Sequence, residues 1–265
     1  MTNFSAIAPS YQKNSLVQAS EGEMLLSLLR LAGDEDILDV GCGTGNLTAV
    51  LRAKTSGRVV GIDRAEGMLG QAQAFHGDQG IEFLSADSEN LPFAGEFDCI
   101  FCNSVFQWFP RPAVNLAGFY RALRPDGRVG VQTPATSSYC PNFLQAIEHC
   151  RRSPELDSLF AWFRSPWFFL DTDEAYRALF TKAGFRVATC RIDTVNRGYT
   201  VPQAMDIFNS GAAAGYLNQS YFSVPLPSDF AKRVRAEVRE AFAEQADANG
   251  RIDLVFKRLF VLAGK

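Results

Sequence analysis

The chain has 265 residues, of which 47% are hydrophobic and 21% are charged, and its formal net charge is −3. A chain of this length and composition can bury a full core, which excludes intrinsic disorder, collagen-like repeats and small scaffolds held by disulfides. An acidic balance without a run of Lys or Arg provides no electrostatic footprint for a polyanion, so nucleic acid is not an expected partner.

Neither a membrane segment nor a leader is evident. No apolar run approaches the roughly 18 residues that span a membrane, and the first residues lack the basic and apolar regions of a signal peptide. We therefore expect a cytoplasmic protein with no membrane partner and with its six cysteines reduced. Cys99 and Cys102 lie in an apolar run typical of a buried strand, where residues three apart face opposite ways, so no metal site is expected.

Short apolar runs alternate with helical patterns up to residue 133. Strands are expected at 36–41, 58–63, 81–87, 97–103 and 127–133, and helices at 21–33, 46–54, 65–75 and 113–123. This alternation predicts an α/β fold with a parallel sheet that is covered by helices on both faces.

The pattern changes after a first unit, which comprises residues 1–133. Residues 134–170 contain prolines and aromatic clusters without a clean strand, whereas 171–195 resume a helix and a strand. Residues 196–250 are again irregular, and 251–265 contain the closing apolar run LVFKRLFVLA. We predict two insertions, 134–170 and 196–250, that enter near one edge of the sheet and form a lid.

A glycine loop follows the first strand and opens a helix. Gly41, Gly43 and Gly45 in DVGCGTGN permit positive φ and let backbone N–H groups approach a ligand. The spacing is G-x-G-x-G, with Asp39 before it and Asn46 where a dinucleotide fingerprint has Gly or Ala. The loop therefore indicates a ligand other than a dinucleotide.

Acidic residues end the next two strands. Asp63, about twenty residues beyond the loop, stands where a carboxylate accepts both hydroxyls of a ribose. Asp87, followed by Ser88, stands where an acceptor takes the amino group of a purine. Because ligands of open α/β sheets bind outside the carboxyl ends of the strands, these features together indicate a nucleoside.

The successive motifs DILDVGCGTGN, GIDRAEGML, LSADSENLPF, FDCIFCNSVFQWF and ALRPDGRVGV resemble those of the class I S-adenosylmethionine-dependent methyltransferases. The ending LVFKRLFVLAGK is similar to the final hairpin of that fold. The resemblance implies a Rossmann-like, doubly wound, seven-stranded and mostly parallel sheet with a reversed final strand. The start FSAIAPSYQKNSLVQ and the segment NSVFQWF resemble the malonyl-carrier-protein and trans-aconitate methyltransferases, which esterify free carboxylates.

The resemblance also implies cofactor contacts. The loop containing Asp39, Gly41, Cys42 and Gly43 would line the methionine moiety of S-adenosylmethionine, whose product is S-adenosylhomocysteine. The remaining contacts would be Asp63 with the ribose, Met68 with the adenine face, Asp87 and Ser88 with the adenine edge, Asn103 with the sulfonium, and Tyr11 above the site.

The acceptor is expected to arrive already anionic. A sulfonium carries its own leaving group, so the protein mainly aligns the nucleophile, and the only two histidines provide few general bases. A carboxylate, with a pKa near 4, satisfies this condition, either on a small molecule or on a carrier-bound acyl group. Arg111, Arg164 and Tyr139 are candidates for holding it, and Gln107 and Trp108 for the substrate side; each also suits a structural role.

Alternatives remain open at this level. They are a methyltransferase for another oxygen or nitrogen acceptor, a nucleic-acid methyltransferase, a nicotinamide dehydrogenase, and a cofactor-binding regulatory or scaffold protein. The aromatic residues favour a small, partly hydrophobic acceptor, since all three tryptophans lie between residues 108 and 167 and would form an apolar lid.

Overall fold

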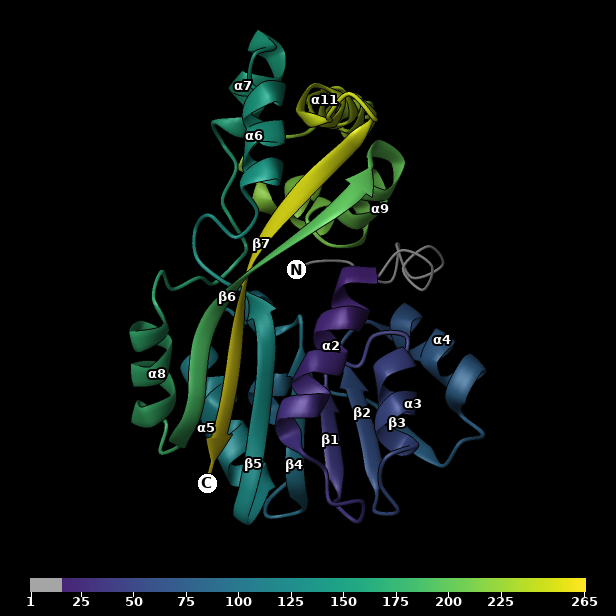
Figure 1. The fold of residues 1–265 in the computed structure, drawn as a ribbon, viewed down its shortest axis with the longest axis vertical. Helices are drawn as coiled ribbons and strands as arrows, with labels where there is room; N and C mark the ends of the chain where they lie inside the picture. Colours follow the sequence, from purple (N-terminus) through teal and green to yellow (C-terminus); the bar gives the residue numbers. More distant parts are fainter. Residues whose placement is uncertain (1–15) are drawn as a thin grey trace.

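Seven strands form one sheet in the computed structural model, which describes residues 16–265 and the side chains from residue 21 onward (Figure 1). The strands are β1 (Ile37–Val40), β2 (Val59–Asp63), β3 (Ile81–Ser85), β4 (Phe97–Asn103), β5 (Leu123–Pro134), β6 (Arg186–Thr200) and β7 (Arg251–Gly264). Their order is β3-β2-β1-β4-β5-β7-β6, and β7 is antiparallel to both β5 and β6. The predicted fold class is therefore confirmed, including the reversed final strand.

Helices cover both faces of this sheet. They are α2 (Leu16–Leu29), α3 (Asn46–Arg52), α4 (Glu66–His76), α5 (Pro112–Ala122) and α8 (Asp173–Lys182), with the short turns η2 (Ser88–Asn90) and η3 (Phe106–Trp108). Successive strand residues face opposite ways, so Ile37 packs with α2 and α3, whereas Leu38 lies in the cluster that contains α5 and α8. The apolar strands are thus buried on both faces, as parallel sheets require.

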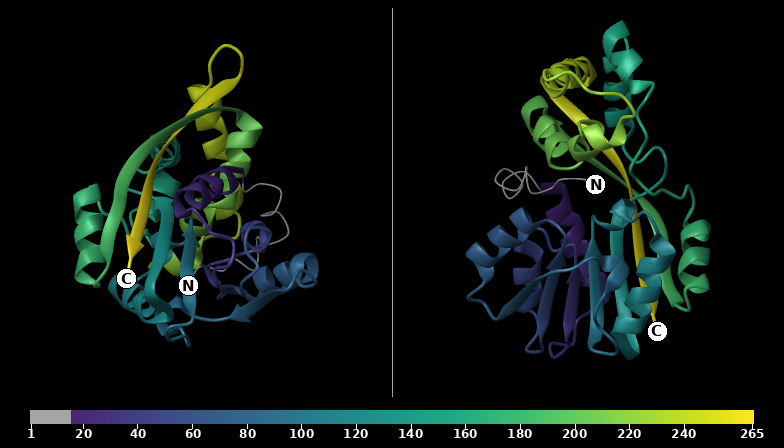
Figure 2. Two further views of the ribbon diagram at one scale, coloured as in Figure 1. Left: turned by 60° about the horizontal axis from the view of Figure 1, so that its bottom comes forward. Right: turned by 180° about the vertical axis from the view of Figure 1, so that it is seen from behind.

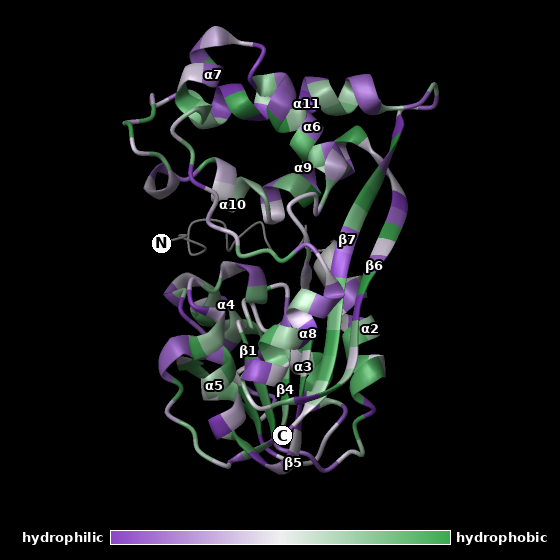
Figure 3. Cartoon of the chain, turned by 90° about the vertical axis from the view of Figure 1, so that its left-hand side faces the viewer, coloured by the Kyte–Doolittle hydropathy of each residue, from purple (hydrophilic) through white to green (hydrophobic). Residues whose placement is uncertain are grey.

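A separate helical layer lies beyond the carboxyl ends of the parallel strands (Figures 1 and 2). We call it the cap; its helices are α6 (Pro141–Cys150), α7 (Pro154–Phe160), α9 (Val201–Ser210), α10 (Ala213–Tyr216) and α11 (Phe230–Gln245), with the turn η4 (Gln219–Tyr221). The cap has its own apolar cluster, which is centred on aromatic side chains such as Phe143, Phe208 and Phe242. Figure 3 shows its helices with both hydrophobic and hydrophilic residues, as expected where one face packs inward.

Two long strands connect the cap to the sheet. β7 pairs with β5 only from Arg258 to Gly264, but it pairs with β6 along its whole length, so β6 and β7 continue as a two-stranded ribbon into the cap (Figure 3). β6 therefore ends at Thr200, beyond the expected start of the second insertion at residue 196. Asn196 and Gly198 have low strand propensity, but β7 supplies them with a complete ladder of partners.

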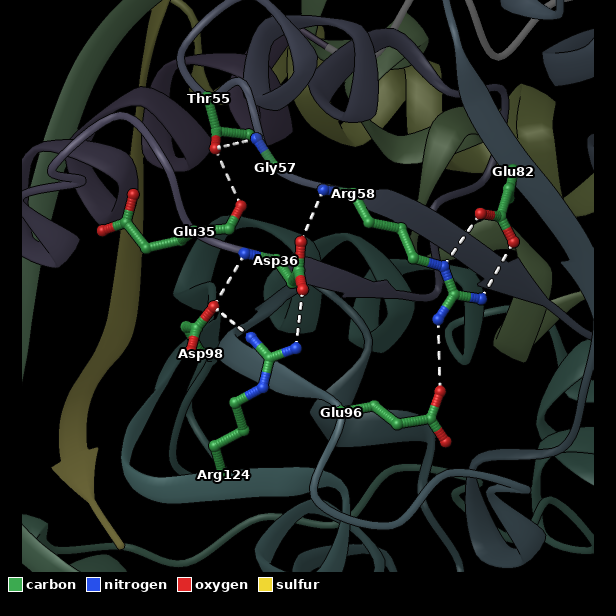
Figure 4. Close-up of polar contacts among 9 residues, drawn as sticks. All are labelled: Glu35, Asp36, Thr55, Gly57, Arg58, Glu82, Glu96, Asp98 and Arg124. Carbon is green, nitrogen blue, oxygen red and sulfur yellow. Dashed lines mark hydrogen bonds and ion pairs between the residues drawn. The ribbon is translucent and has the colours of Figure 1, made fainter.

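Charged side chains at the amino-terminal ends of the parallel strands, away from the cap, are paired with one another (Figure 4). The Arg124 guanidinium donates to Asp36 and Asp98 at 2.7 and 2.6 Å. The Arg58 guanidinium donates to Glu82 and to Glu96. These ion pairs therefore link the amino-terminal ends of neighbouring strands. Within residues 16–265, no helix is long and apolar enough to cross a membrane.

Candidate active site

A cavity of about 1070 Å³ lies between the carboxyl ends of the strands and the cap. Its floor comes from the glycine loop, the end of β2 and the turns after β3 and β4. Its roof comes from the segments before α6 and after α7, from α9, from residues 220–223 and from β7. Ligand pockets commonly measure about 300–1,000 Å³, so this one has room for a nucleoside and a second molecule. Its floor and roof differ in chemistry.

The glycine loop forms the floor where β1 ends. Gly41, Gly43 and Gly45 have φ values of 74°, 56° and 80°, in the left-handed region that favours glycine. The Gly41 N–H donates to the carbonyl of Ile62 at 2.8 Å, which ties the loop to β2. A Cβ on Gly41 would lie 2.2 Å from a methyl group of Val105, so no side chain fits there. Gly41 and Gly43 both line the cavity.

Asp63 links the loop to the end of β2. Its Oδ2 accepts from the Gly43 N–H at 3.0 Å and its Oδ1 from the Ala65 N–H at 2.8 Å, while the residue also lines the cavity. Burial raises the pKa of this carboxyl above its usual value, although both backbone bonds act against that effect. Two backbone bonds occupy about half of a carboxylate's acceptor positions, which leaves capacity for a ligand's hydroxyls.

Asp39 lies beneath the loop rather than in the cavity wall. It is 3% exposed, and its Oδ2 accepts from the Thr48 hydroxyl at 2.7 Å, which fixes α3 to the end of β1. Burial is the main reason that its pKa is raised to about 7, and the like charge of Asp63 adds to the effect. Cys42, next in the loop, also lies outside the cavity wall, and its Sγ is 3.9 Å from the Gly43 carbonyl oxygen.

The floor continues across the ends of β2 and β3. Met68 at the start of α4, Asp87 and Ser88 all line the cavity. Asp87 caps η2 by accepting from the Glu89 N–H at 3.0 Å, and Ser88 accepts from the Asn115 side chain at 2.7 Å. The apolar side chain of Met68 and the polar groups of Asp87 and Ser88 therefore line the part of the cavity at the ends of β2 and β3.

The segment after β4 joins floor to roof. Asn103, the last residue of β4, is 8% exposed and lies outside the cavity wall, whereas Gln107 and Trp108 line it. Gln107 donates to the Ser104 carbonyl at 2.9 Å, and its side-chain oxygen accepts from the Thr133 hydroxyl, so both ends of its amide hold the turn. The ring of Trp108 lies against the ring of Trp167.

The roof is aromatic. Trp167 has its ring centroid 5.7 Å from that of Trp108, 5.8 Å from Tyr139 and 4.9 Å from Tyr216. Tyr139 is stacked on Phe169 at 5.3 Å, and both line the cavity. Such aromatic walls exclude water and favour an apolar ligand surface.

The predicted acceptor residues have different positions. Tyr139 is buried in the roof, and burial raises the pKa of its phenol well above the usual value, so it is a neutral hydroxyl. Arg164 lines the cavity from an exposed position. Arg111 lies outside the cavity wall, 67% of its side chain is exposed, and its guanidinium pairs with Glu89. Tyr11 lies outside the described residues.

Arg258 of β7 is a cavity residue that the sequence reasoning missed. It is 4% exposed, lines the cavity, and has its guanidinium carbon 4.8 Å from the centre of the Phe256 ring. The signal was its position in the strand: Arg258 is the one cation among apolar residues on the buried face, with Phe256 and Phe260 on either side. From the sequence alone, LVFKRLFVLA is predicted only as the closing apolar run of the chain, with no role for Arg258.

Neither histidine lines the cavity. His76 ends α4 with its Nε2 3.2 Å from the Asn46 side-chain oxygen. His149 of α6 lies among glutamates, 3.4 Å from Glu237 and 3.3 Å from Glu244 of α11. Within the described residues, no imidazole is therefore placed to take a proton from a ligand in this cavity.

Residues 38–131 match a family described as a methyltransferase domain. The chain is 38% identical over 138 residues to a malonyl-acyl-carrier-protein O-methyltransferase of Hahella chejuensis, a match that covers 51% of this chain and 50% of that relative. It is 29% identical over 240 residues to a trans-aconitate 2-methyltransferase of Methylobacterium nodulans, covering 90% of each. The chain thus spans about half the length of the malonyl-carrier relative and nearly all of the aconitate relative.

A solved structure has the same fold. The geranyl diphosphate C-methyltransferase of Streptomyces coelicolor A3(2), in complex with S-adenosylhomocysteine, aligns with a TM-score of 0.53 at 14% identity and covers 93% of this chain and 80% of that one. At this identity the likeness shows the fold alone.

Proposed function

We propose that the chain is an S-adenosylmethionine-dependent methyltransferase, and that it moves a methyl group from S-adenosylmethionine to a carboxylate oxygen of a small, partly hydrophobic acceptor. One observation carries the proposal. The cavity has a floor of glycine backbone and strand-end acidic residues, and it continues under an aromatic roof without a histidine.

The floor suits the cofactor. Gly41 and Gly43 bring backbone close to a methionine moiety, and the free acceptor positions of Asp63 suit the two hydroxyls of a ribose. Met68 supplies an apolar surface for adenine, and Asp87 with Ser88 supplies polar groups at its edge. Asp39 acts from beneath by accepting a hydrogen bond from Thr48, which fixes α3 to the end of β1. Cys42 and Asn103 lie outside the cavity wall, so we assign them no direct contact with the cofactor.

When bound, the cofactor supplies a methyl carbon on a positively charged sulfur. The acceptor's oxygen forms a bond to that carbon as the sulfur–carbon bond breaks; the bonding pair stays on sulfur, and the product is a neutral ester. No proton moves, which agrees with a cavity that no imidazole lines. The protein therefore acts by orientation and by excluding water, which together can lower a barrier by about 7–11 kcal/mol.

The substrate side supports a carboxylate on an apolar body. Gln107 holds the turn after β4 in place, and Trp108 forms a wall beside the methyl position. Tyr139 offers a neutral hydroxyl in the roof, and Arg164 stands at an exposed part of the cavity. Arg111 is paired with Glu89, so we assign it to the support of η2. The names of two relatives, a malonyl-carrier and a trans-aconitate methyltransferase, also specify acids.

Two measurements test this function. Calorimetric titration with S-adenosylhomocysteine should show binding, and labelled S-adenosylmethionine should transfer its methyl group to carboxylic acids as a base-labile ester. The acceptor panel contains free acids, a malonyl-loaded carrier protein, phenols and amines.

Absence of binding would refute the cofactor assignment. Label on a phenol or an amine, with none on an acid, would replace the carboxylate by another oxygen or nitrogen acceptor. Binding without transfer to any member of the panel would favour a regulatory or scaffold protein.

A further inference from the structure

Arg258 is a buried cation that forms no ion pair with any side chain described from residue 21 onward. Its Nε has no hydrogen-bond partner, and no ion pair joins its guanidinium to a carboxylate among the side chains of residues 21–265. The carboxylate with the largest electrostatic influence on Arg258 is the buried Glu21 of α2, but the ion pair of Glu21 is with Arg197, at 3.2 Å. Burying a charge without a partner is strongly unfavourable, so such a group is normally compensated by a ligand or an ion pair.

Neighbouring residues direct this guanidinium into the cavity. Arg258 pairs along the backbone with Pro134 of β5 and Asp193 of β6, just beyond the end of the parallel sheet. Its side chain lies on the same face as Phe256, over whose ring it stands, and close to Tyr139. The contact with the Phe256 ring restricts the guanidinium, whose N–H donors form a fork suited to a carboxylate.

The other cavity cations are differently placed. In the described part of the lining, they are Arg64, which pairs with Asp87 at 3.8 Å on the cofactor side, and the exposed Arg164. The wall near Arg258 consists of the aromatic residues Tyr139 and Phe143 together with Phe256. The cavity therefore provides one deep position for an anion, surrounded by apolar surface.

We propose that Arg258 binds the acceptor's carboxylate, and that the acceptor is a monocarboxylic acid with an apolar body rather than a di- or tricarboxylic acid. This inference rests on the proposed methyl transfer and names the acceptor class for it. Each additional carboxylate would enter aromatic surface without a buried cation. Methylation also removes the charge that Arg258 holds, so the ester binds more weakly than the acid and leaves.

The first experiment compares acceptors on the wild-type protein. With labelled S-adenosylmethionine, phenylacetate and octanoate should exceed trans-aconitate in kcat/KM by at least about tenfold, because the additional carboxylates are desolvated without a partner. Trans-aconitate as the better acceptor would overturn the monocarboxylate assignment.

The second experiment changes the cation. Arg258→Gln should raise the KM for phenylacetate by about 10- to 100-fold, the range for losing charge-assisted hydrogen bonds, and Arg258→Lys should fall between it and the wild type. Arg258→Met fills the same space without charge and is used if Arg258→Gln does not fold. The matched control is Arg191→Gln on the adjacent strand, because Arg191 also stacks on an aromatic ring, Phe260, but lies outside the cavity.

Two further readouts separate binding from a structural role. S-adenosylhomocysteine affinity should be unchanged in the Arg258 variants, and the preference of the wild type for phenylacetate over its methyl ester as a ligand should disappear. An unchanged KM, or a loss of cofactor affinity equal to the loss of acceptor affinity, would overturn the role of Arg258.

Calorimetric titration of phenylacetate into the S-adenosylhomocysteine complex keeps the two claims distinct. Arg258-dependent binding without methyl transfer would refute the proposed function alone. Methyl transfer to phenylacetate that is independent of Arg258 would refute this inference alone.

Discussion

The floor and the roof of the cavity are built in different ways. The floor uses backbone conformation and short polar side chains from residues 40–89, where one βα unit follows another along the chain, and Asp39 supports it from beneath. The roof uses aromatic side chains and one buried cation from residues 108–258, which are distant in sequence and which the ribbon of β6 and β7 helps to bring together. A nucleoside site can therefore arise from local turns, whereas the acceptor site depends on the packing of distant segments.

The largest effect is expected in the floor, at Asp39. Its pKa of about 7 in the folded protein lies above the ordinary value of 3.8, so the folded state binds more protons between these values and loses stability as pH rises from about 4 to 7. Asp39→Asn should remove this pH dependence. Above pH 7, its free energy of unfolding should exceed that of the wild type by up to about 4 kcal/mol.

Urea unfolding of the cofactor-free protein at pH 5 and pH 8 measures this difference. The exposed Asp78→Asn is the control. An Asp39→Asn variant with the pH slope of the wild type would show that the carboxyl is ionised without cost in the folded state.

The next effect is expected in the roof, at Trp167. Its ring contacts those of Trp108, Tyr139 and Tyr216, so Trp167→Ala should cost about 3 kcal/mol of stability, as for other large-to-small changes at aromatic residues. It should also raise the acceptor KM while S-adenosylhomocysteine affinity is retained. Trp162 is 54% exposed, so Trp162→Ala should leave stability and KM unchanged.

Denaturant unfolding and steady-state kinetics at saturating cofactor measure these effects. A parallel loss of cofactor affinity in Trp167→Ala would show that floor and roof do not act separately.

The smallest effect is expected at Asp63. Asp63→Ala should weaken S-adenosylhomocysteine binding by roughly 1–3 kcal/mol, because the ribose hydroxyls lose a charged acceptor. The acceptor KM at saturating cofactor should not change. Calorimetry on this variant and on Asp78→Ala measures the difference, and equal affinities in the two would remove Asp63 from the cofactor site.

The strands and the floor were predictable because their signals are local. Ile37–Val40 is a short apolar run directly before glycines, and Gly41 and Gly43 adopt the positive φ that their lack of a Cβ permits. Asp63 ends β2 and Asp87 follows β3, so the parallel sheet places both at the carboxyl ends of its strands. These relationships need only the order of residues and the periodicity of strands.

The roof was not predictable to the same depth. In the sequence, Arg258 looks like an ordinary strand residue. The pairing of β7 shows which face of the sheet it occupies, and its described surroundings leave its Nε without a hydrogen-bond partner. Arg111 stands close in sequence to Trp108, but Glu89 holds it outside the cavity wall. The continuation of β6 to Thr200 depends on a partner strand more than fifty residues away.

The sequence by itself determined the sheet, the glycine loop and the acidic strand ends, because each depends on interactions between near neighbours in the chain. Only the tertiary structure decided which cation is buried in the cavity and which tryptophans form the roof. The reason is physical: the burial of a charge and the stacking of rings are set by residues that are distant in sequence and adjacent only after folding.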